Sequence, residues 1–142
     1  MSSQTHPKPP KTLSAVNKFA IVLGILLIIE GFIGLFNPMV FGILSTNVLH
    51  ALIHLFLGFT GLYIGLRNHA RKFSLYIGIL LLAVAILYFI PATNTVIVDL
   101  LNVNNAVAYL NTGVGLLAIL FALLTPKRVI PGPHHAAHTH HH

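Results

Sequence analysis

The sequence contains no cysteine and very few charged residues. Without cysteine the chain has no disulfide, no thiolate metal site and no cysteine nucleophile. Charged residues make up 7% of the 142 residues, whereas a soluble domain carries about a quarter because its surface must stay in water. Two carboxylates and eight Lys or Arg residues are too few to cover a water-exposed globule. Most of the chain is therefore expected to be surrounded by lipid.

The patterns of common enzymes and of nucleic-acid-binding proteins are also missing. We find no serine–histidine–acid set, no phosphate-binding glycine loop and no pair of carboxylates. The net charge of +6 does not indicate nucleic acid, because the Lys and Arg residues lie in short clusters at the ends of apolar runs. The first apolar run is too long for a cleavable signal and lacks a small-residue exit, so it is expected to remain in the membrane.

Four apolar runs have the length of a membrane-spanning helix, about 20 residues. Pro91 is expected to end the third helix, and Asn47 and Asn104 stand where they can cap the second and fourth. The sequence therefore predicts an all-α bundle of four transmembrane helices. The predicted helices are residues 15–36, 48–66, 73–90 and 106–124, within a membrane domain at 15–125 that follows a disordered basic arm at 1–14 and precedes a His-rich tail at 126–142.

The basic residues predict the orientation of the bundle. Loops 37–47 and 91–105 contain no Lys or Arg. The basic residues flank the other helix ends: Lys8, Lys11, Lys18, Arg67, Arg71, Lys72, Lys127 and Arg128. By the positive-inside rule both termini are cytoplasmic, in a plasma membrane or a thylakoid. The two loops without basic residues are themselves apolar, and are expected to lie in the interface or to cap the bundle.

The two halves of the membrane domain resemble each other. Residues 18–27 can be laid on residues 72–81 with six of ten positions identical, and His54 and Gly58 then correspond to Asn111 and Gly115. This pattern predicts a tandem duplication of a helical hairpin, with chance similarity between apolar segments as the alternative. Glycines spaced along the helices are expected to allow close helix packing, or a homodimer face. These are Gly31, Gly34, Gly58, Gly61, Gly65, Gly113 and Gly115.

Four of the polar side chains within the predicted helices are candidates for a function: Glu30, His50, His54 and Asn111. Counting from the helix ends at about 1.5 Å per residue places Glu30, His54 and Asn111 about 8–9 Å below one membrane surface. The simplest interpretation is hydrogen bonding across helices by Glu30, His54 and Asn111. Alternatively, His50 and His54, four residues apart on one face, could bind a divalent metal with Glu30, or ligate a haem or chlorin. A Glu–His pair could also relay protons.

Histidine also dominates the end of the chain. A His-rich tract binds Zn, Ni or Cu ions flexibly and weakly compared with a preformed site. The residues of this tail are His134, His135, His138, His140, His141 and His142. The run is interrupted, which favours a native tail over a purification tag.

The segment at 47–62 carries a family resemblance. It reads Asn-Val-Leu-His-Ala-Leu-Ile-His-Leu-Phe-Leu-Gly-Phe-Thr-Gly-Leu, and this pairing of histidines with spaced glycines resembles the signature of an uncharacterised family of small four-helix bacterial membrane proteins. The resemblance covers about residues 16–125. Family members commonly carry another His near the start of helix four, where this chain has Asn111. The resemblance implies a four-helix fold in a bacterial membrane and no particular reaction.

The small size and the glycine-lined helix faces favour a non-enzymatic membrane protein, with an accessory or scaffold subunit of a larger membrane complex as the leading hypothesis. Its expected partners are the bilayer and that complex or further copies of the chain. Two alternatives remain open: an intramembrane metal-, haem- or pigment-binding protein that uses His50 and His54, and a small-solute or proton transporter.

Overall fold

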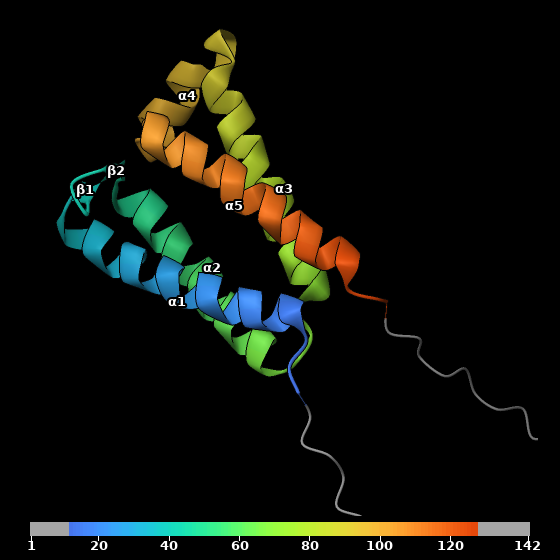
Figure 1. Ribbon diagram of the computed structural model, residues 1–142. Coiled ribbons are helices and arrows are strands. Elements are labelled where there is room, and N and C mark those ends of the chain that lie inside the picture. Colours follow the sequence, from blue (N-terminus) through green and yellow to red (C-terminus); the bar gives the residue numbers. More distant parts are fainter. Residues whose placement is uncertain (1–11, 128–142) are drawn as a thin grey trace, which may run out of the picture.

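The computed structural model describes residues 12–127, which form an all-α bundle with a short strand pair (Figure 1). The elements are α1 (Ala15–Phe36), β1 (Met39–Val40), β2 (Leu44–Ser45), α2 (Val48–Leu66), α3 (Ala70–Phe89), α4 (Pro91–Leu101) and α5 (Asn105–Leu124). Four of these helices, α1, α2, α3 and α5, are long and apolar enough to cross a membrane. The predicted fold class is confirmed, and the chain is a multi-pass integral membrane protein. The His tail from His134 and the first 11 residues lie outside the described part.

The helix boundaries follow the expected capping chemistry, with two differences. The Asn47 and Asn104 side chains accept hydrogen bonds from the backbone of the first turns of α2 and α5. α3 begins at Ala70, so Arg71 and Lys72 lie in its first turn and not in a loop. Residues 91–101, expected to be a loop, form the 11-residue helix α4, because Pro91 ends one helix and is well suited to the first position of the next. At about 1.5 Å per residue, α4 is too short to span a membrane.

The four long helices form two hairpins, α1 with α2 and α3 with α5 (Figure 1). Glycines bring the two backbones of each hairpin together. A Cβ on Gly24 would lie 2.7 Å from the Gly58 carbonyl oxygen, and a Cβ on Gly78 would lie 2.7 Å from that of Gly115. Each hairpin is therefore packed through a glycine pair at the same place, and a side chain at any of these positions would force the helices apart.

The other glycines on the inner side of the first hairpin also meet a neighbouring element. Gly31 and Gly34 face residues of the β2–α2 region, Gly65 faces the backbone of α1, and Gly61 faces the ring of Phe73. Gly113 differs from the sequence-based expectation. A Cβ there would meet no atom within 4 Å, because Gly113 lies on the exposed face of α5.

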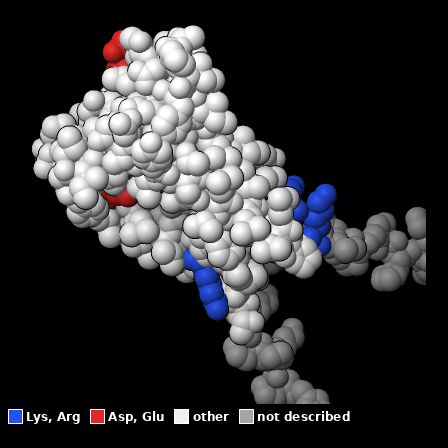
Figure 2. All heavy atoms as spheres, turned by 45° about the horizontal axis from the view of Figure 1, so that its top comes forward, with Lys and Arg blue, Asp and Glu red and all other residues white. Residues whose placement is uncertain are grey.

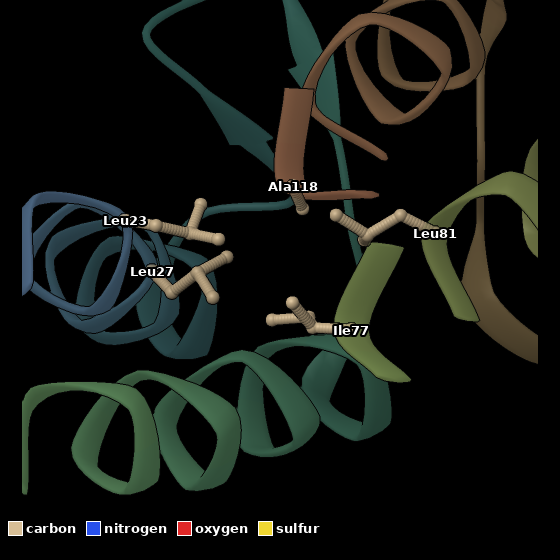
Figure 3. Close-up of a cluster of buried hydrophobic side chains, with 5 residues drawn as sticks. All are labelled: Leu23, Leu27, Ile77, Leu81 and Ala118. Carbon is tan, nitrogen blue, oxygen red and sulfur yellow. The ribbon is translucent and has the colours of Figure 1, made fainter. Parts of the chain in front are cut away.

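The two hairpins join through a buried apolar cluster at the centre of the bundle. Figure 3 shows its five side chains pointing toward one another from α1, α3 and α5. They are Leu23, Leu27, Ile77, Leu81 and Ala118. A second cluster packs α4 against α5 at one end of the bundle, through Ile97, Leu101, Val103, Val107 and Ala108.

The two ends of the bundle differ in charge. We call the end that carries β1, β2 and α4 the capped end, and the opposite end the basic end. Figure 2 shows the Lys and Arg atoms of the face in view gathered at the basic end, beside the points where the chain leaves the bundle. The described basic residues are Lys18, Arg67, Arg71, Lys72 and Lys127. All five lie at or near helix ends on that side, which is the arrangement expected of a membrane protein with one cytoplasmic face.

Candidate polar cavity at the capped end

A cavity of about 90 Å³ lies near the capped end, between α1, α2, α5 and the loop that carries β1 and β2. Its polar lining residues are Glu30, Ser45, Thr46, His50, His54 and Asn111. Its apolar lining residues are Leu23, Leu26, Leu27, Val40, Leu44, Leu81, Val107, Leu110 and Val114. The structure thus brings to one place the four intramembrane polar residues that the sequence singles out. We call this space the capped-end cavity.

Glu30 and His54 form the closest polar pair of the cavity. Glu30 lies six residues before the end of α1, and His54 lies six residues after the start of α2, so the antiparallel hairpin sets them at one level. The Nδ1 atom of His54 is 3.3 Å from Oε2 of Glu30, and both side chains are mostly buried. The pair links α1 to α2 and leaves the second ring nitrogen, Nε2 of His54, without a partner among the described residues.

His50 is held by the roof of the cavity. Asn47 caps α2 and places His50 in its first turn, one helical turn before His54. Nδ1 of His50 lies 3.0 Å from the carbonyl oxygen of Leu101, at the end of α4. Because a carbonyl can only accept, Nδ1 carries the hydrogen and Nε2 keeps a free lone pair. The two imidazole rings meet edge to face with their centres 4.4 Å apart.

Asn111 completes the polar wall from the side of α5. The residue is 7% exposed, and its amide forms no hydrogen bond with the residues between 12 and 127. No fully buried side-chain nitrogen or oxygen in this range lacks a partner, so the Asn111 amide borders open space. The same reasoning applies to the Nε2 atoms of His50 and His54. The Asn111 amide is therefore free to form hydrogen bonds with a molecule in the cavity.

The roof of the cavity is a network of asparagine side chains and backbone carbonyls. Asn47 donates to the Leu100 carbonyl, and Asn104 donates to the Ile43 carbonyl, each at 2.8 Å. Asn102 donates to the carbonyl of Thr46, and Ser45 donates to that of Asn102. These bonds tie the loop of one hairpin to the loop of the other at the capped end.

The floor of the cavity is apolar. Leu23, Leu27 and Leu81 line the cavity and also belong to the central cluster with Ile77 (Figure 3). Below this level the buried polar side chains of the described residues are already paired. Ser74 donates to the Ala118 carbonyl, and Asn17 bonds Ser14, Asn68 and the Ala70 amide. The described part of the chain therefore contains no polar path from the cavity to the basic end.

The predicted metal set is not assembled in this arrangement. Within residues 12–127, no group of three or more His, Cys, Asp or Glu side chains is placed to hold a metal ion. The geometry gives a physical reason, because Glu30 contacts Nδ1 of His54 while Nδ1 of His50 turns toward Leu101. Binding of a divalent metal by His50, His54 and Glu30, or of a haem or chlorin by His50 and His54, stays a prediction. So does ion binding by the histidine tail, which lies outside the described residues.

Two polar residues of the cavity were not singled out by the sequence. Ser45 and Thr46 directly precede the Asn47 cap of α2, and both are buried and line the cavity. Their burial depends on α4, which the sequence did not predict. The polar character of a loop segment that is otherwise apolar was the only available signal.

The model of a protein family described as "Domain of unknown function (DUF4383)" matches residues 17–124. These residues include the four long helices almost completely and every residue that lines the capped-end cavity. No curated protein and no solved structure matches the chain.

Proposed function

The chain belongs to the DUF4383 family, and from this premise we propose that it is a non-enzymatic membrane protein that binds a small molecule in its capped-end cavity. The match over residues 17–124 confirms the expected family and carries no activity with it. The paired-histidine signature at residues 47–62 stays a prediction. The proposal therefore rests on the cavity. Its main support is Asn111, a buried amide that lines the cavity and has no partner among the described residues.

The surroundings of Asn111 support a binding site rather than a packing defect. Accidental voids in protein interiors are lined by apolar atoms, whereas this cavity has a carboxyl group, two imidazoles and an amide on its walls. The carboxyl group and the two imidazoles are held in place by contacts with the protein. Glu30 contacts His54, and His50 contacts the carbonyl oxygen of Leu101. Polar groups that are fixed on one side and unpartnered on the other are pre-organised for a ligand.

The geometry of the cavity also bears on the transporter and accessory-subunit hypotheses. A transporter needs a polar path through the bilayer, and the apolar floor at Leu23, Leu27 and Leu81 supports a site that is closed toward the basic end. The accessory-subunit hypothesis stays a prediction. The glycine-lined helix faces are one of its two supports, and most of these glycines contact neighbouring elements of the same chain.

The proposal can be tested by native mass spectrometry of the full chain, extracted from its own membrane in lipid discs without detergent. We expect the wild-type protein to carry a small molecule as a discrete mass increment. In the Asn111→Leu variant this increment should fall at least threefold, because the leucine fills the cavity and removes the amide.

Gly113→Ala is the matched control, because it lies two residues along α5 and its new methyl group meets no atom within 4 Å. Circular dichroism checks that each variant keeps its helices. A wild-type protein without any increment, or an increment that is equal in wild type and a folded Asn111→Leu variant, would contradict ligand binding at this site.

A further inference from the structure

The capped-end cavity opens sideways, between α1 and α5. Of its lining residues only Leu26 and Leu110 are exposed, at 50% and 41%, and they come from these two helices. The residues that line the roof and the floor are buried or half-buried. We call the gap bordered by Leu26 and Leu110 the entrance. Glu30, which is 17% exposed, lies one helical turn beyond Leu26 on α1.

The entrance faces hydrocarbon rather than water. Leu110 lies five residues after the start of α5, and Leu26 lies ten residues before the end of α1. At 1.5 Å per residue these positions are about 8 and 15 Å below the helix ends, within one leaflet of a bilayer about 30 Å thick. The lining residues of the loop that carries β1 and β2 are buried or half-buried. A molecule that reaches the cavity must therefore come from the lipid phase.

The hydrogen-bonding groups of the cavity define the kind of head group that fits. His50 offers the lone pair of Nε2, because its Nδ1 donates to Leu101. Nδ1 of His54 faces Oε2 of Glu30, so Nε2 is the ring nitrogen left for a ligand. This nitrogen either donates or accepts, according to which ring nitrogen carries the hydrogen. Asn111 adds one acceptor and two donors.

The cavity therefore presents both hydrogen-bond donors and acceptors, and none of its lining residues is a Lys or Arg. A hydroxyl or carbonyl oxygen satisfies such a set, whereas a phosphate or carboxylate head would bring a charge with no described Lys or Arg near it. The basic residues of the described chain lie at the other end of the bundle (Figure 2). The remaining walls of the cavity are leucine and valine side chains, which suit a hydrocarbon chain.

We propose that the ligand of the capped-end cavity is an uncharged membrane amphiphile that enters between Leu26 and Leu110 and places a hydroxyl or carbonyl head among His50, His54 and Asn111. This inference rests on the proposed function and adds the class of ligand and its route. A neutral glycerolipid and a quinol lipid share this chemistry, so the test includes both.

The test uses the full chain in lipid discs and a monoacylglycerol with a photoreactive diazirine near the head of its acyl chain. We expect saturable labelling that maps to α1 and α5 beside the entrance. Excess unlabelled monoacylglycerol or decyl-quinol should compete, and the stronger competitor identifies the source. A fatty acid with the same photoreactive chain should label the site at least tenfold less, because its carboxylate has no counter-charge there.

Variants at the entrance test the route. Leu26→Trp and Leu110→Trp place a large ring in the entrance and should reduce labelling at least tenfold. Leu117→Trp is the control, because Leu117 lies two turns further along the same face of α5, is 48% exposed and does not line the cavity. Equal labelling by the fatty acid, or full labelling of both folded entrance variants, would overturn the inference.

The two proposals fail in different ways. In the first case, the wild-type protein carries a mass increment that Asn111→Leu reduces, but the monoacylglycerol gives no saturable labelling and the quinol does not compete. This result would support the binding site and refute the neutral amphiphile as its ligand. A wild-type protein without such an increment refutes the binding site itself.

Discussion

At the scale of single residues, the polar side chains of the membrane domain differ in how completely they are partnered. Near the basic end, Asn17 is 2% exposed and uses both atoms of its amide in hydrogen bonds. Near the capped end, Asn111 is almost as buried and uses neither. The Asn17 amide stabilises the fold through its hydrogen bonds, whereas the Asn111 amide is available to bond another molecule. This contrast is the basis of the functional proposal.

The contact between Glu30 and His54 is expected to stabilise the first hairpin. A double-mutant cycle with Glu30→Ala, His54→Ala and the double variant should give a coupling energy of about 0.6–1.7 kcal/mol, as found for side-chain hydrogen bonds within membranes. The measurement is reversible unfolding in mixed detergent. Tyr109→Phe, on the exposed face of α5, serves as a control and should not change the free energy of unfolding. Strict additivity of the two single variants would show that the pair is not formed.

Much of this site could be expected from the sequence, and the limits have physical causes. The depth of Glu30, His54 and Asn111 follows from helix length, because each helix must span the membrane. Rotation of each helix about its axis does not follow from length, so the sequence could not say whether Glu30 approaches His54 or His50. The hydrogen-bond partner of His50 could not be predicted either, because it is the backbone carbonyl of Leu101 at the end of α4, a helix that the sequence did not predict.

At the scale of helices and hairpins, the two halves of the bundle make equivalent contacts. Gly24 packs on Gly58 as Gly78 packs on Gly115. Asn47 and Asn104 each cap a helix and each donate to a carbonyl of the opposite half. These correspondences follow the alignment of residues 18–27 with 72–81 and support the predicted hairpin duplication, which stays a prediction. The same alignment pairs His54 with Asn111, so the cavity draws on both halves but not on identical residues.

The glycine pairs predict that glycine-to-alanine substitutions at different positions differ strongly in their effect on the free energy of unfolding. Gly24→Ala should lower the free energy of unfolding by about 1–3 kcal/mol, because the new Cβ would lie 2.7 Å from two backbone atoms of α2. Gly113→Ala should leave it unchanged or raise it slightly, since alanine favours helix and meets no neighbour. Thermal unfolding in detergent compares the two. Similar losses in both variants would contradict the described packing of α1 on α2.

The paired asparagines test whether the two halves are equivalent. Asn47→Ala and Asn104→Ala each remove one helix cap and one hydrogen bond to the opposite half. Each should lower the stability by about 1–2 kcal/mol, and the two losses should agree within about 0.5 kcal/mol. Asn47→Asp and Asn104→Asp keep the cap acceptor but not the donor, so they should recover part of the loss. A loss at one position alone would argue against equivalent halves.

At the scale of the whole molecule, the bundle has one basic end and one end closed by β1, β2 and α4. The charge asymmetry predicts that the basic end and both termini face the cytoplasm. The capped-end cavity would then open to the outer leaflet. The chain has no cysteine, so single cysteines can report the orientation without a background signal.

We expect Thr95→Cys, on the exposed side of α4, to react with a membrane-impermeant maleimide on intact cells. Pro126→Cys, at the basic end, should react only after the membrane is permeabilised. Both substitutions leave every Lys and Arg in place, so they do not disturb the charge pattern that sets the orientation. The reverse labelling pattern would place the cavity in the inner leaflet and contradict the predicted topology.

The most direct test of the central claim is a crystal structure of the wild-type protein grown in a lipid mesophase from material extracted without detergent washing. Our account predicts density in the capped-end cavity that contacts the Asn111 amide and Nε2 of His54 and continues between Leu26 and Leu110 into the lipid. A cavity that holds only ordered water, with Asn111 satisfied by that water, would contradict a ligand site and leave Glu30, His50, His54 and Asn111 as residues that only stabilise the bundle.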